Sequence, residues 1–414
     1  MPSSYPSLPY GSRAFARLEA LRRFTDVPGQ IHRLYLSPAH RLAVDAVADM
    51  MRAAGCDSVH VDALGTVVGR YEAVQPGHPA LMIGSHIDSV KDAGAYDGTF
   101  GVVAGIGIVE VLHETGRRLP FAVELLAFGD EENVRFPTTL SSSRALAGTF
   151  DPAALDGRDE AGVRFADALV QFGGDAEGIA GLARRREDVL GYVELHIEQG
   201  PVLDGRDLPV GVVTAIAGST RFRVRLTGTA GHAGTVPMGM RHDALAAAAE
   251  MILAVERVAG EVPGTVATVG RIAAEPGAVN VIPGGASFTI DARAPVDADR
   301  HAMVATMTTA LQAIAVRRGV GLVLESFLES AACPCDGQLR ARLSAAISRR
   351  QIPVLELASG AGHDAMAMAA LCPVGMLFVR CAGGISHNPA ESMTIADADV
   401  AIAVLLDFVL AFQA

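Results

Sequence analysis

The chain has 414 residues, 50% of them hydrophobic and 19% charged, which is enough for two or three domains that each bury a core. Its 34 Lys and Arg residues against 46 Asp and Glu residues give a net charge of -12, which argues against nucleic acid or an anionic membrane as a partner. No apolar run reaches the about 20 residues that a membrane span needs, and residues 1–24 lack the basic-then-apolar order of a signal peptide. Five scattered cysteines fit a reducing compartment better than a disulfide framework, so we expect a soluble, cytoplasmic protein.

The first half of the chain alternates predicted helices and buried strands. An amphipathic helix is expected over 38–54, with Ser37 as its N-cap and Pro38 at the first helical position. Continuous apolar runs then predict buried strands, with an apolar helix after the first of them. The strands are expected at 80–83, 121–128 and 191–197, and the helix at 101–112. This order predicts the α/β class with a doubly wound sheet.

From about residue 213 the pattern becomes that of an antiparallel sheet with one exposed face. Residues 220–227 alternate apolar and arginine side chains, as a strand with one wet face does. Further strands are expected near 265–272, 286–292 and 321–328, and helices over 243–258 and 299–317. The order βαββαβ is typical of a ferredoxin-like domain. We therefore predict an inserted domain over 213–329.

The last segment returns to α/β character. Strands are expected at 353–357 and 374–379, and a closing helix at 396–412. We therefore expect residues 330–414 to rejoin residues 1–212 in one catalytic domain.

Ionisable side chains cluster where the predicted strands of the first half end. They are His86 and Asp88 after the first strand, Asp130, Glu131 and Glu132 after the second, and His196 and Glu198 at the third. Open α/β sheets bind ligands at that edge, so three strands deliver these residues to one place. Taken singly, each has an ordinary interpretation as a turn former, a solvated pair or a core histidine. The joint pattern, together with Asp97 before a helix and His387 in a turn after the final strand, favours a metal site.

These residue types suit two divalent ions that share one carboxylate. The first predicted site consists of His86, Asp97 and His196, and the second of Asp97, Glu132 and His387. Because consecutive side chains on an extended segment diverge, Glu131 is predicted to stand apart from Glu132, near the attacking water, as general base. Ligands without cysteine suit Zn²⁺ or Mn²⁺, and also Co²⁺ or Ni²⁺. Two such ions acidify a water and polarise a carbonyl group.

Seven motifs, in order along nearly the whole chain, resemble the signatures of the hydantoinase/carbamoylase amidases in the zinc peptidase superfamily. They lie at 84–90, 96–98, 131–136, 194–200, 231–235, 360–365 and 384–389. The resemblance implies a mixed-sheet catalytic domain with an inserted lid and dimerisation domain, and the same ligand roles. It adds Asp88 as the residue that orients His86. The chain departs from the family at Asn133 and Val134, where a Gly-Ser pair is common.

The resemblance also implies a set of substrate contacts. The matching positions are Gln199, His232, Asn280, Arg293 and His363. Arg293 offers a planar fork for a carboxylate, Asn280 a further donor, and His232 a donor to the developing oxyanion. His363 matches a position near the leaving group. Without the resemblance, these residues would be interpreted as ordinary loop or strand residues.

The activity implied by the resemblance is that of a two-metal amidohydrolase. It would cleave the ureido C–N bond of a small ureido acid, either an N-carbamoyl-L-amino acid or allantoate. The family also implies a homodimer in which His232 reaches the other subunit's site. An aminoacylase or dipeptidase of the same superfamily, and a non-catalytic binding protein on the same scaffold, are the alternatives.

Overall fold

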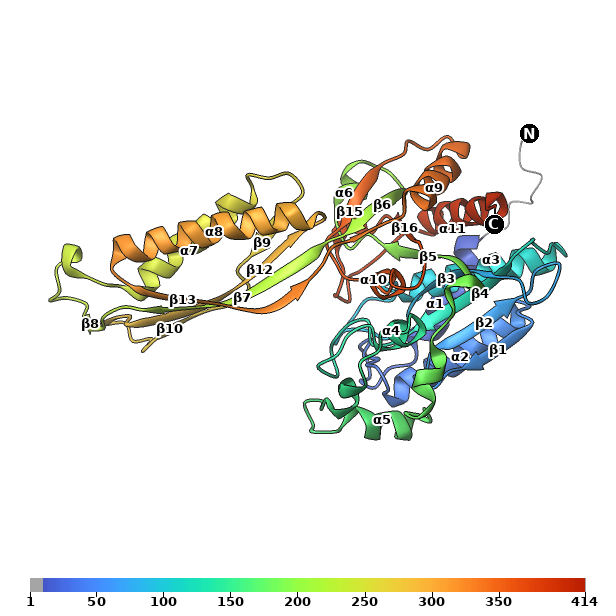
Figure 1. The fold of residues 1–414 in the computed structure, drawn as a ribbon, viewed down its shortest axis with the longest axis horizontal. Helices are drawn as coiled ribbons and strands as arrows, with labels where there is room; N and C mark the ends of the chain where they lie inside the picture. The colour runs from blue at the N-terminus through green and yellow to red at the C-terminus, as the bar shows by residue number, and fades with distance from the viewer. Residues whose placement is uncertain (1–9, 414) are drawn as a thin grey trace. The chain divides into compact units, whose positions relative to one another are not determined.

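The computed structural model describes residues 10–413, which form two compact units. Unit 1 comprises the described residues up to Thr214, together with Cys335–Leu357 and the chain from Gly362 onward. Unit 2 comprises Ala215–Pro334 and the short return segment Ala358–Ala361. Figure 1 shows both along the colour gradient of the chain. No helix within residues 10–413 is long and apolar enough to cross a membrane.

The larger sheet has nine strands, and its parallel centre lies in unit 1. Its order is β1-β2-β4-β3-β5-β16-β6-β14, and β15 also pairs with β6. The strands are β1 Ser58–Val61, β2 Val67–Tyr71, β3 Ala80–His86, β4 Ala122–Phe128, β5 Val189–Ile197, β6 Val210–Ile216, β14 Cys333–Pro334, β15 Glu356–Ser359 and β16 Val374–Val379. Because β3, β4, β5 and β16 run parallel, their carboxyl ends meet at one edge of the sheet.

Helices pack on this sheet and close one hydrophobic core. Helix α3 contacts β3, β4 and β5, α1 and α11 pack against α3, and α2 packs on β1 and β2. The α-helices of unit 1 are α1 Tyr10–Arg22, α2 Pro38–Ala53, α3 Thr99–Glu114, α4 Ser141–Leu146, α5 Phe165–Phe172, α6 Val202–Gly205, α9 Gly337–Arg349, α10 Ala365–Met368 and α11 Ile395–Ala411. Short 3₁₀ turns lie at Pro152–Asp156, Gly178–Leu182, Arg186–Asp188 and Ala382–Gly384. The predicted cap of α2 is confirmed, since the Ser37 hydroxyl accepts the His40 N–H at 3.2 Å.

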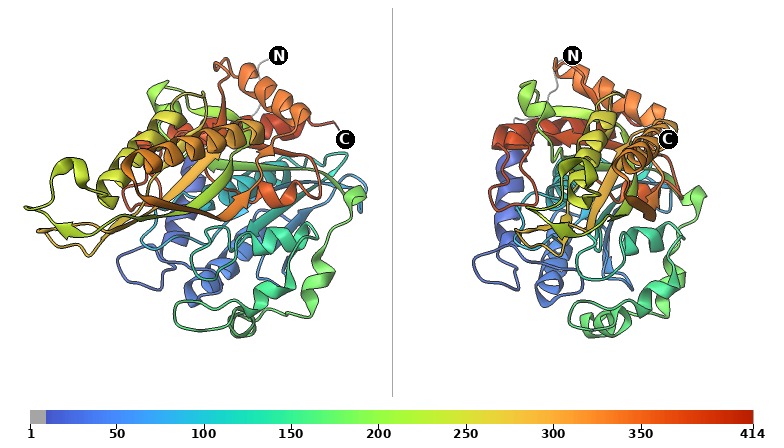
Figure 2. Two further views of the ribbon diagram at one scale, coloured as in Figure 1. Left: turned by 60° about the vertical axis from the view of Figure 1, so that its left-hand side comes forward. Right: turned by 90° about the vertical axis from the view of Figure 1, so that its left-hand side faces the viewer.

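Unit 2 is an antiparallel sheet with two helices on one face (Figures 1 and 2). The sheet order is β10-β12-β7-β13, and β9 pairs with β12. The elements are β7 Gly218–Thr227, α7 Ala244–Ala259, β9 Val266–Thr268, β10 Ile272–Glu275, β12 Gly285–Ala294, α8 Asp297–Arg318 and β13 Gly321–Ser330, with a 3₁₀ turn at Met238–Met240 and a ribbon of β8 Gly231–His232 and β11 Val281–Ile282. The predicted βαββαβ order holds except that two strands, β9 and β10, stand where one was expected, and the short β8 and β11 are additional. Unit 2 also has its own hydrophobic core, against which the helices pack.

Three predicted strands are divided in the structure or differ from it by more than two residues at one end. The strand expected at 265–272 is wrong, because β9 and β10 are separate strands along β12. Thr268 pairs with Asp291 and Ile272 with Phe288, so one extra residue bulges out between the two strands. The strand expected at 353–357 begins three residues later, at Glu356. Strand β3 extends to His86, which is therefore its last residue and does not follow it.

Candidate metal centre

Five predicted metal ligands come together in unit 1, at the edge where the parallel strands end. They are His86, Asp97, Glu132, His196 and His387. The ligand atoms of His86, Asp97 and His196 lie within 4.8 Å of one another. Those of Asp97, Glu132 and His387 do so as well. Asp97 belongs to both groups, so its carboxylate joins them.

In the first group, two imidazole nitrogens face one carboxylate oxygen. Nε2 of His196 lies 3.1 Å from Oδ1 of Asp97, and Nε2 of His86 lies 3.7 Å from it. The Nδ1 atoms face backbone carbonyl oxygens, that of Asp88 at 3.1 Å and that of Ile197 at 2.8 Å. A ring that donates from Nδ1 presents a lone pair at Nε2. Oδ1 of Asp97 accepts no hydrogen bond and is buried, so a cation between these three atoms would satisfy all of them.

The second group is less buried and lies around the other oxygen of Asp97. Nε2 of His387 is 3.2 Å from Oδ2 of Asp97 and 3.4 Å from Oε2 of Glu132. Gln199 donates to the same Oδ2 at 2.9 Å. The His387 side chain is 50% exposed, whereas those of Asp97 and Glu132 are 6% and 4% exposed. This donor set of histidine and carboxylate also fits a divalent ion.

Burial makes this cluster of carboxylates costly without a cation. Burial, followed by the charge of Asp97, raises the pKa of Glu132 to about 7. The hydrogen bond with Asp97 raises the pKa of His387 to about 9. The first shift disfavours the charged carboxylate of Glu132, and the second favours a positive charge on His387 beside the carboxylates. Divalent cations at the two groups would offset the crowding of the carboxylates.

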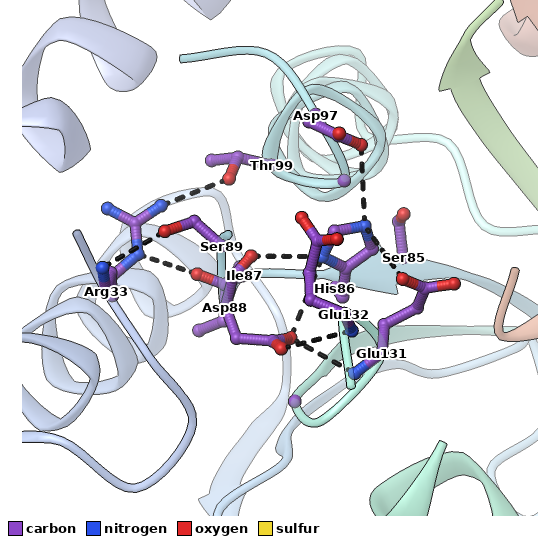
Figure 3. A network of polar contacts seen from close by, with 12 residues as sticks. Arg33, Ser85, His86, Ile87, Asp88, Ser89, Asp97, Thr99, Glu131 and Glu132 are labelled. Atoms are coloured by element: carbon purple, nitrogen blue, oxygen red, sulfur yellow. Dashed lines mark hydrogen bonds and ion pairs between the residues drawn. The ribbon is translucent and has the colours of Figure 1, made fainter. Parts of the chain in front are cut away.

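Glu131 lies beside the first group and apart from its neighbour Glu132 (Figure 3). Its Oε2 is 4.0 Å from Nε2 of His86, while Glu132 faces His387. The backbone N–H groups of both glutamates donate to the two oxygens of Asp88, each at 3.4 Å. The two side chains thus face different histidines and stand apart, as we expected. They lie, however, in an irregular loop after β4 and not on an extended segment.

Asp88 contacts His86 mainly through its backbone. The carbonyl oxygen of Asp88 is 3.1 Å from Nδ1 of His86, and the carboxylate is 3.7 Å away. The carboxylate is nearer to the N–H groups of the glutamate loop. Asp88 therefore links the His86 strand end to the loop that carries Glu131.

Comparisons with known proteins agree with this geometry. The sequence profile of the family described as Peptidase family M20/M25/M40 matches residues 82–411. The chain belongs to this family. Allantoate deiminase 1 from Glycine max is 42% identical over 91% of this chain and 84% of that protein. N-carbamoyl-L-amino acid amidohydrolase from Geobacillus stearothermophilus is 40% identical over 95% of this chain and 97% of that protein.

A solved structure of a hydantoinase/carbamoylase family amidase from Burkholderia multivorans has a TM-score of 0.91 and 31% identity, over 97% of both chains. These similarities confirm the family resemblance of the seven motifs and the fold class. Together with the buried His, Asp and Glu groups, they make the chain a metal-dependent amidohydrolase of the M20 family.

A buried arginine, which we did not predict as a site residue, stabilises the segments that carry two of the metal ligands (Figure 3). Arg33 is 3% exposed. Its Nε donates to the carbonyl of Ile87 at 2.6 Å, and its Nη2 donates to the hydroxyl of Thr99 at 3.2 Å. It thereby joins the segment after His86 to the start of α3, next to Asp97. In the sequence, Arg33 stands between the apolar residues Ile31 and Tyr35 and opens the segment 33–38, which is similar to a family segment ahead of the first helix, but neither feature assigned it a role.

A second unpredicted residue, Glu391, holds the loop of Asp97. Its Oε1 accepts the N–H groups of Tyr96 at 2.9 Å and Asp97 at 3.1 Å. Its Oε2 accepts the hydroxyl of Ser386 at 2.9 Å, and Ser386 also donates to Asp97 at 3.1 Å. Glu391 thus connects the loop of the shared ligand with the turn before His387. Its distance from any strand end left it without a sequence signal.

A glycine allows the close approach of Asp97 and His86. Gly98 has a φ of +60°, and a Cβ atom there would lie 2.4 Å from the His86 ring. Only glycine tolerates both conditions. The Tyr96–Gly98 motif therefore supplies both a metal ligand, Asp97, and the glycine that leaves room for the His86 ring.

His363 and Gln199 also lie in unit 1. His363 is 1% exposed, and its ring centroid is 4.5 Å from that of His196. Ligand atoms of Glu194, His196 and His363 form a third group within 4.8 Å. Burial lowers the pKa of His363, which favours its neutral form. Gln199 contacts the second group, because its side-chain amide donates a hydrogen bond to Asp97.

The other three predicted substrate residues lie in unit 2. His232 ends β8 and pairs with Val281 of β11, and the carbonyl of Asn280 accepts the Ala233 N–H at 3.0 Å. His232 and Asn280 are therefore close on one ribbon. Arg293 lies on β12 in the main sheet, where it lines a cavity of about 570 Å³.

Proposed function

We propose that this amidohydrolase cleaves the ureido C–N bond of an N-carbamoyl-L-amino acid or of allantoate. The observation that carries the proposal is the near-equal identity to an allantoate deiminase and to an N-carbamoyl-L-amino acid amidohydrolase over at least 91% of the chain. Allantoate and N-carbamoyl-L-amino acids both carry a ureido group beside a carboxylate. The position of Glu131 next to the His86 group supports a hydrolytic use of the site.

The reaction adds one water to the ureido carbon. The bond from this carbon to the substituted nitrogen breaks, that nitrogen receives a proton, and carbamic acid leaves and decomposes to ammonia and carbon dioxide. When bound, two divalent ions acidify the water and polarise the carbonyl group. The proposed holders are His86, Asp97 and His196 for one ion and Asp97, Glu132 and His387 for the other, with Zn²⁺ or Mn²⁺ as the main candidates and Co²⁺ or Ni²⁺ as further ones.

Glu131 would act as the proton carrier. Its carboxylate takes a proton from the attacking water and delivers one to the leaving nitrogen. Asp88 would hold the loop of Glu131 in register with His86 through the two backbone N–H groups. Support for this division comes from the different histidines that Glu131 and Glu132 face.

Five residues would orient the substrate. We assign Arg293 and Asn280 to the carboxylate, His232 to the oxyanion, and Gln199 and His363 to the ureido end. These roles rest on the resemblance of the five positions to the family's substrate contacts.

A panel of substrates tests the proposal. Ammonia release from allantoate and from several N-carbamoyl-L-amino acids is compared with amine release from N-acetyl-amino acids and dipeptides, using protein loaded with one metal at a time. We expect turnover of at least one ureido acid. Turnover confined to N-acetyl-amino acids or dipeptides would replace the proposal by an aminoacylase or dipeptidase function.

We further propose a homodimer in which His232 serves the partner's site. Mixing inactive Glu131→Gln protein with inactive His232→Ala protein, under conditions that exchange subunits, should then restore part of the activity. Mixed dimers contain one site with both residues intact. Exchange without any recovery would assign His232 to its own chain or to no catalytic role.

A further inference from the structure

Arg293 is held by an internal carboxylate. Its Nε donates to Oδ1 of Asp291 at 3.0 Å, and its Nη2 donates to Oδ2 at 2.9 Å. This is a bidentate pair, in which two parallel N–H groups of the guanidinium meet two carboxylate oxygens. Such a pair fixes the plane of the guanidinium as well as its position.

Few N–H groups of Arg293 remain for a ligand once its contacts within the protein are counted. Its Nη1 donates to the carbonyl oxygen of Gly360 at 2.6 Å, within the short return segment of unit 2. A guanidinium has five N–H groups. Asp291 takes two and Gly360 takes one, so one N–H on Nη1 and one on Nη2 remain. These suit one further carboxylate.

Asp291 is itself held from its other side. Arg221 of β7 pairs with Asp291 across the strands, and its Nε donates to Oδ2 at 2.9 Å. We call Arg221, Asp291 and Arg293 the arginine clamp. Burial disfavours the charged form of Asp291, but the hydrogen bond from Arg293 and the charges of both arginines outweigh it and lower its pKa. The clamp therefore carries two positive charges and one negative charge, a net charge that one carboxylate balances.

The arginine clamp lies on the helix-free face of the sheet. Asp291 and Arg293 alternate along β12 with Ile290 and Ala292, which are 2% and 0% exposed in the core of unit 2. All three clamp residues line the cavity of about 570 Å³, together with the threonines Thr268 and Thr289. A partly exposed i,i+2 ion pair contributes little to stability by itself. Ligand binding better explains why the Asp291–Arg293 pair lies at a cavity with N–H groups of Arg293 left for a ligand.

We infer that Asp291 is a positioning residue for carboxylate recognition. With Arg221 on its other side, it fixes the guanidinium of Arg293 so that the free N–H groups on Nη1 and Nη2 face the substrate carboxylate. The inference rests on the proposed role of Arg293. It adds a residue that does not touch the substrate but determines how tightly the acid is bound.

The experiment compares an acid with its carboxamide. Full-length, metal-loaded wild type, Asp291→Asn, Arg293→Gln and the double variant are assayed with N-carbamoyl-L-alanine and N-carbamoyl-L-alaninamide, or with allantoate and its carboxamide if the wild type prefers allantoate. For Asp291→Asn we expect KM for the acid to rise about 10- to 100-fold, with a small change in kcat and no change for the carboxamide. The double variant should be no worse than Arg293→Gln, because Asp291 acts through Arg293.

Two further variants control for a general defect. Asp291→Glu keeps a carboxylate and should recover part of the affinity for the acid. Glu325→Gln removes a carboxylate on β13 that pairs with Arg225 at 3.2 Å, and it should behave as wild type. Equal loss on acid and carboxamide, or additive losses in the double variant, would overturn the inference. If the wild type cleaves only N-acetyl-amino acids or dipeptides, the proposed function fails, and the same comparison with those acids and their carboxamides still tests Asp291.

Discussion

The metal-ligand groups of unit 1 and the arginine clamp of unit 2 hold charge in different ways. In unit 1 the side chains of His86, His196 and Asp97 are 1%, 1% and 6% exposed, and their acceptor atoms face one another. In unit 2 the side chains of Asp291 and Arg293 are 28% and 29% exposed, and their donors and acceptors match. A buried set of acceptors needs a cation from outside, whereas an ion pair with matched partners does not. Metal dependence should therefore belong to unit 1 alone.

Asp97 should give the largest effect, because both metal-ligand groups need it. We expect Asp97→Ala to lose most bound metal and at least about 10³-fold in activity, while binding of an acid product to Arg293 persists. Metal content is measured by elemental analysis and product binding by calorimetry. Asp92→Asn, in the same loop but outside both groups, is the control. Retention of two ions by Asp97→Ala would contradict its shared role.

Glu131 and Glu132 should separate proton transfer from metal binding. Glu131→Gln should keep its metal and lose about 10² to 10⁴ in rate, because only the base is removed. Glu132→Gln should lose metal instead. Metal content and single-turnover rates measured side by side distinguish the two variants. Identical metal content and residual rates would show that the neighbours do not have separate functions.

Arg33 should have an intermediate effect through the segments that it joins. We expect Arg33→Met to weaken metal binding about 10- to 100-fold, the range seen for groups that orient metal ligands, because the Ile87 carbonyl and the Thr99 hydroxyl lose their partner. Competition with a metal chelator measures the change. The exposed Arg23→Met is the matched control. An unchanged metal affinity would leave Arg33 with a role in packing only.

His40 should give the smallest effect, visible as a pH dependence of stability. Burial lowers its pKa from 6.5 to about 3, so below pH 6.5 the unfolded chain binds a proton that the folded chain does not. Folding stability is therefore lost as the pH falls from 6.5 towards 3. Relative to its value at pH 7.5, metal-free wild type should lose about 1 to 1.5 kcal/mol more than His40→Gln at pH 5.5.

Urea unfolding at the two pH values measures this difference. The exposed His60→Gln should follow the wild type. Parallel pH profiles for wild type and His40→Gln would mean that His40 takes up its proton in the folded state.

The metal centre could be predicted from the sequence because its ligands lie at the ends of predicted strands. Of the arginine clamp, only Arg293 was predicted as a site residue. His86, Glu132 and His196 lie at or just after parallel strands that read as continuous apolar runs, so their shared edge follows from the fold class. Arg293 was found only through the family resemblance. Asp291 carried no signal, since on an alternating strand it looks like any solvated residue.

Arg33 and Glu391, which stabilise the ligand-bearing segments, could not be predicted from the sequence for a different reason. Arg33 and Glu391 act through backbone groups of Ile87, Tyr96 and Asp97, far away along the chain. A residue that bonds to a distant carbonyl or N–H leaves no pattern in its own neighbourhood. The bulge between β9 and β10 was missed because one extra residue does not alter the apolar run that predicts a strand.

The spacing of the ligands along the chain also sets an order of assembly during synthesis. The residues of the first group, at 86, 97 and 196, all precede unit 2, whereas the second group needs His387, which follows it. The nascent chain therefore contains all three ligands of the first group before unit 2 is made, although unit 1 is complete only once the chain from Cys335 onward has followed. The second set becomes available only after unit 2 has been made and the ribosome has passed β16.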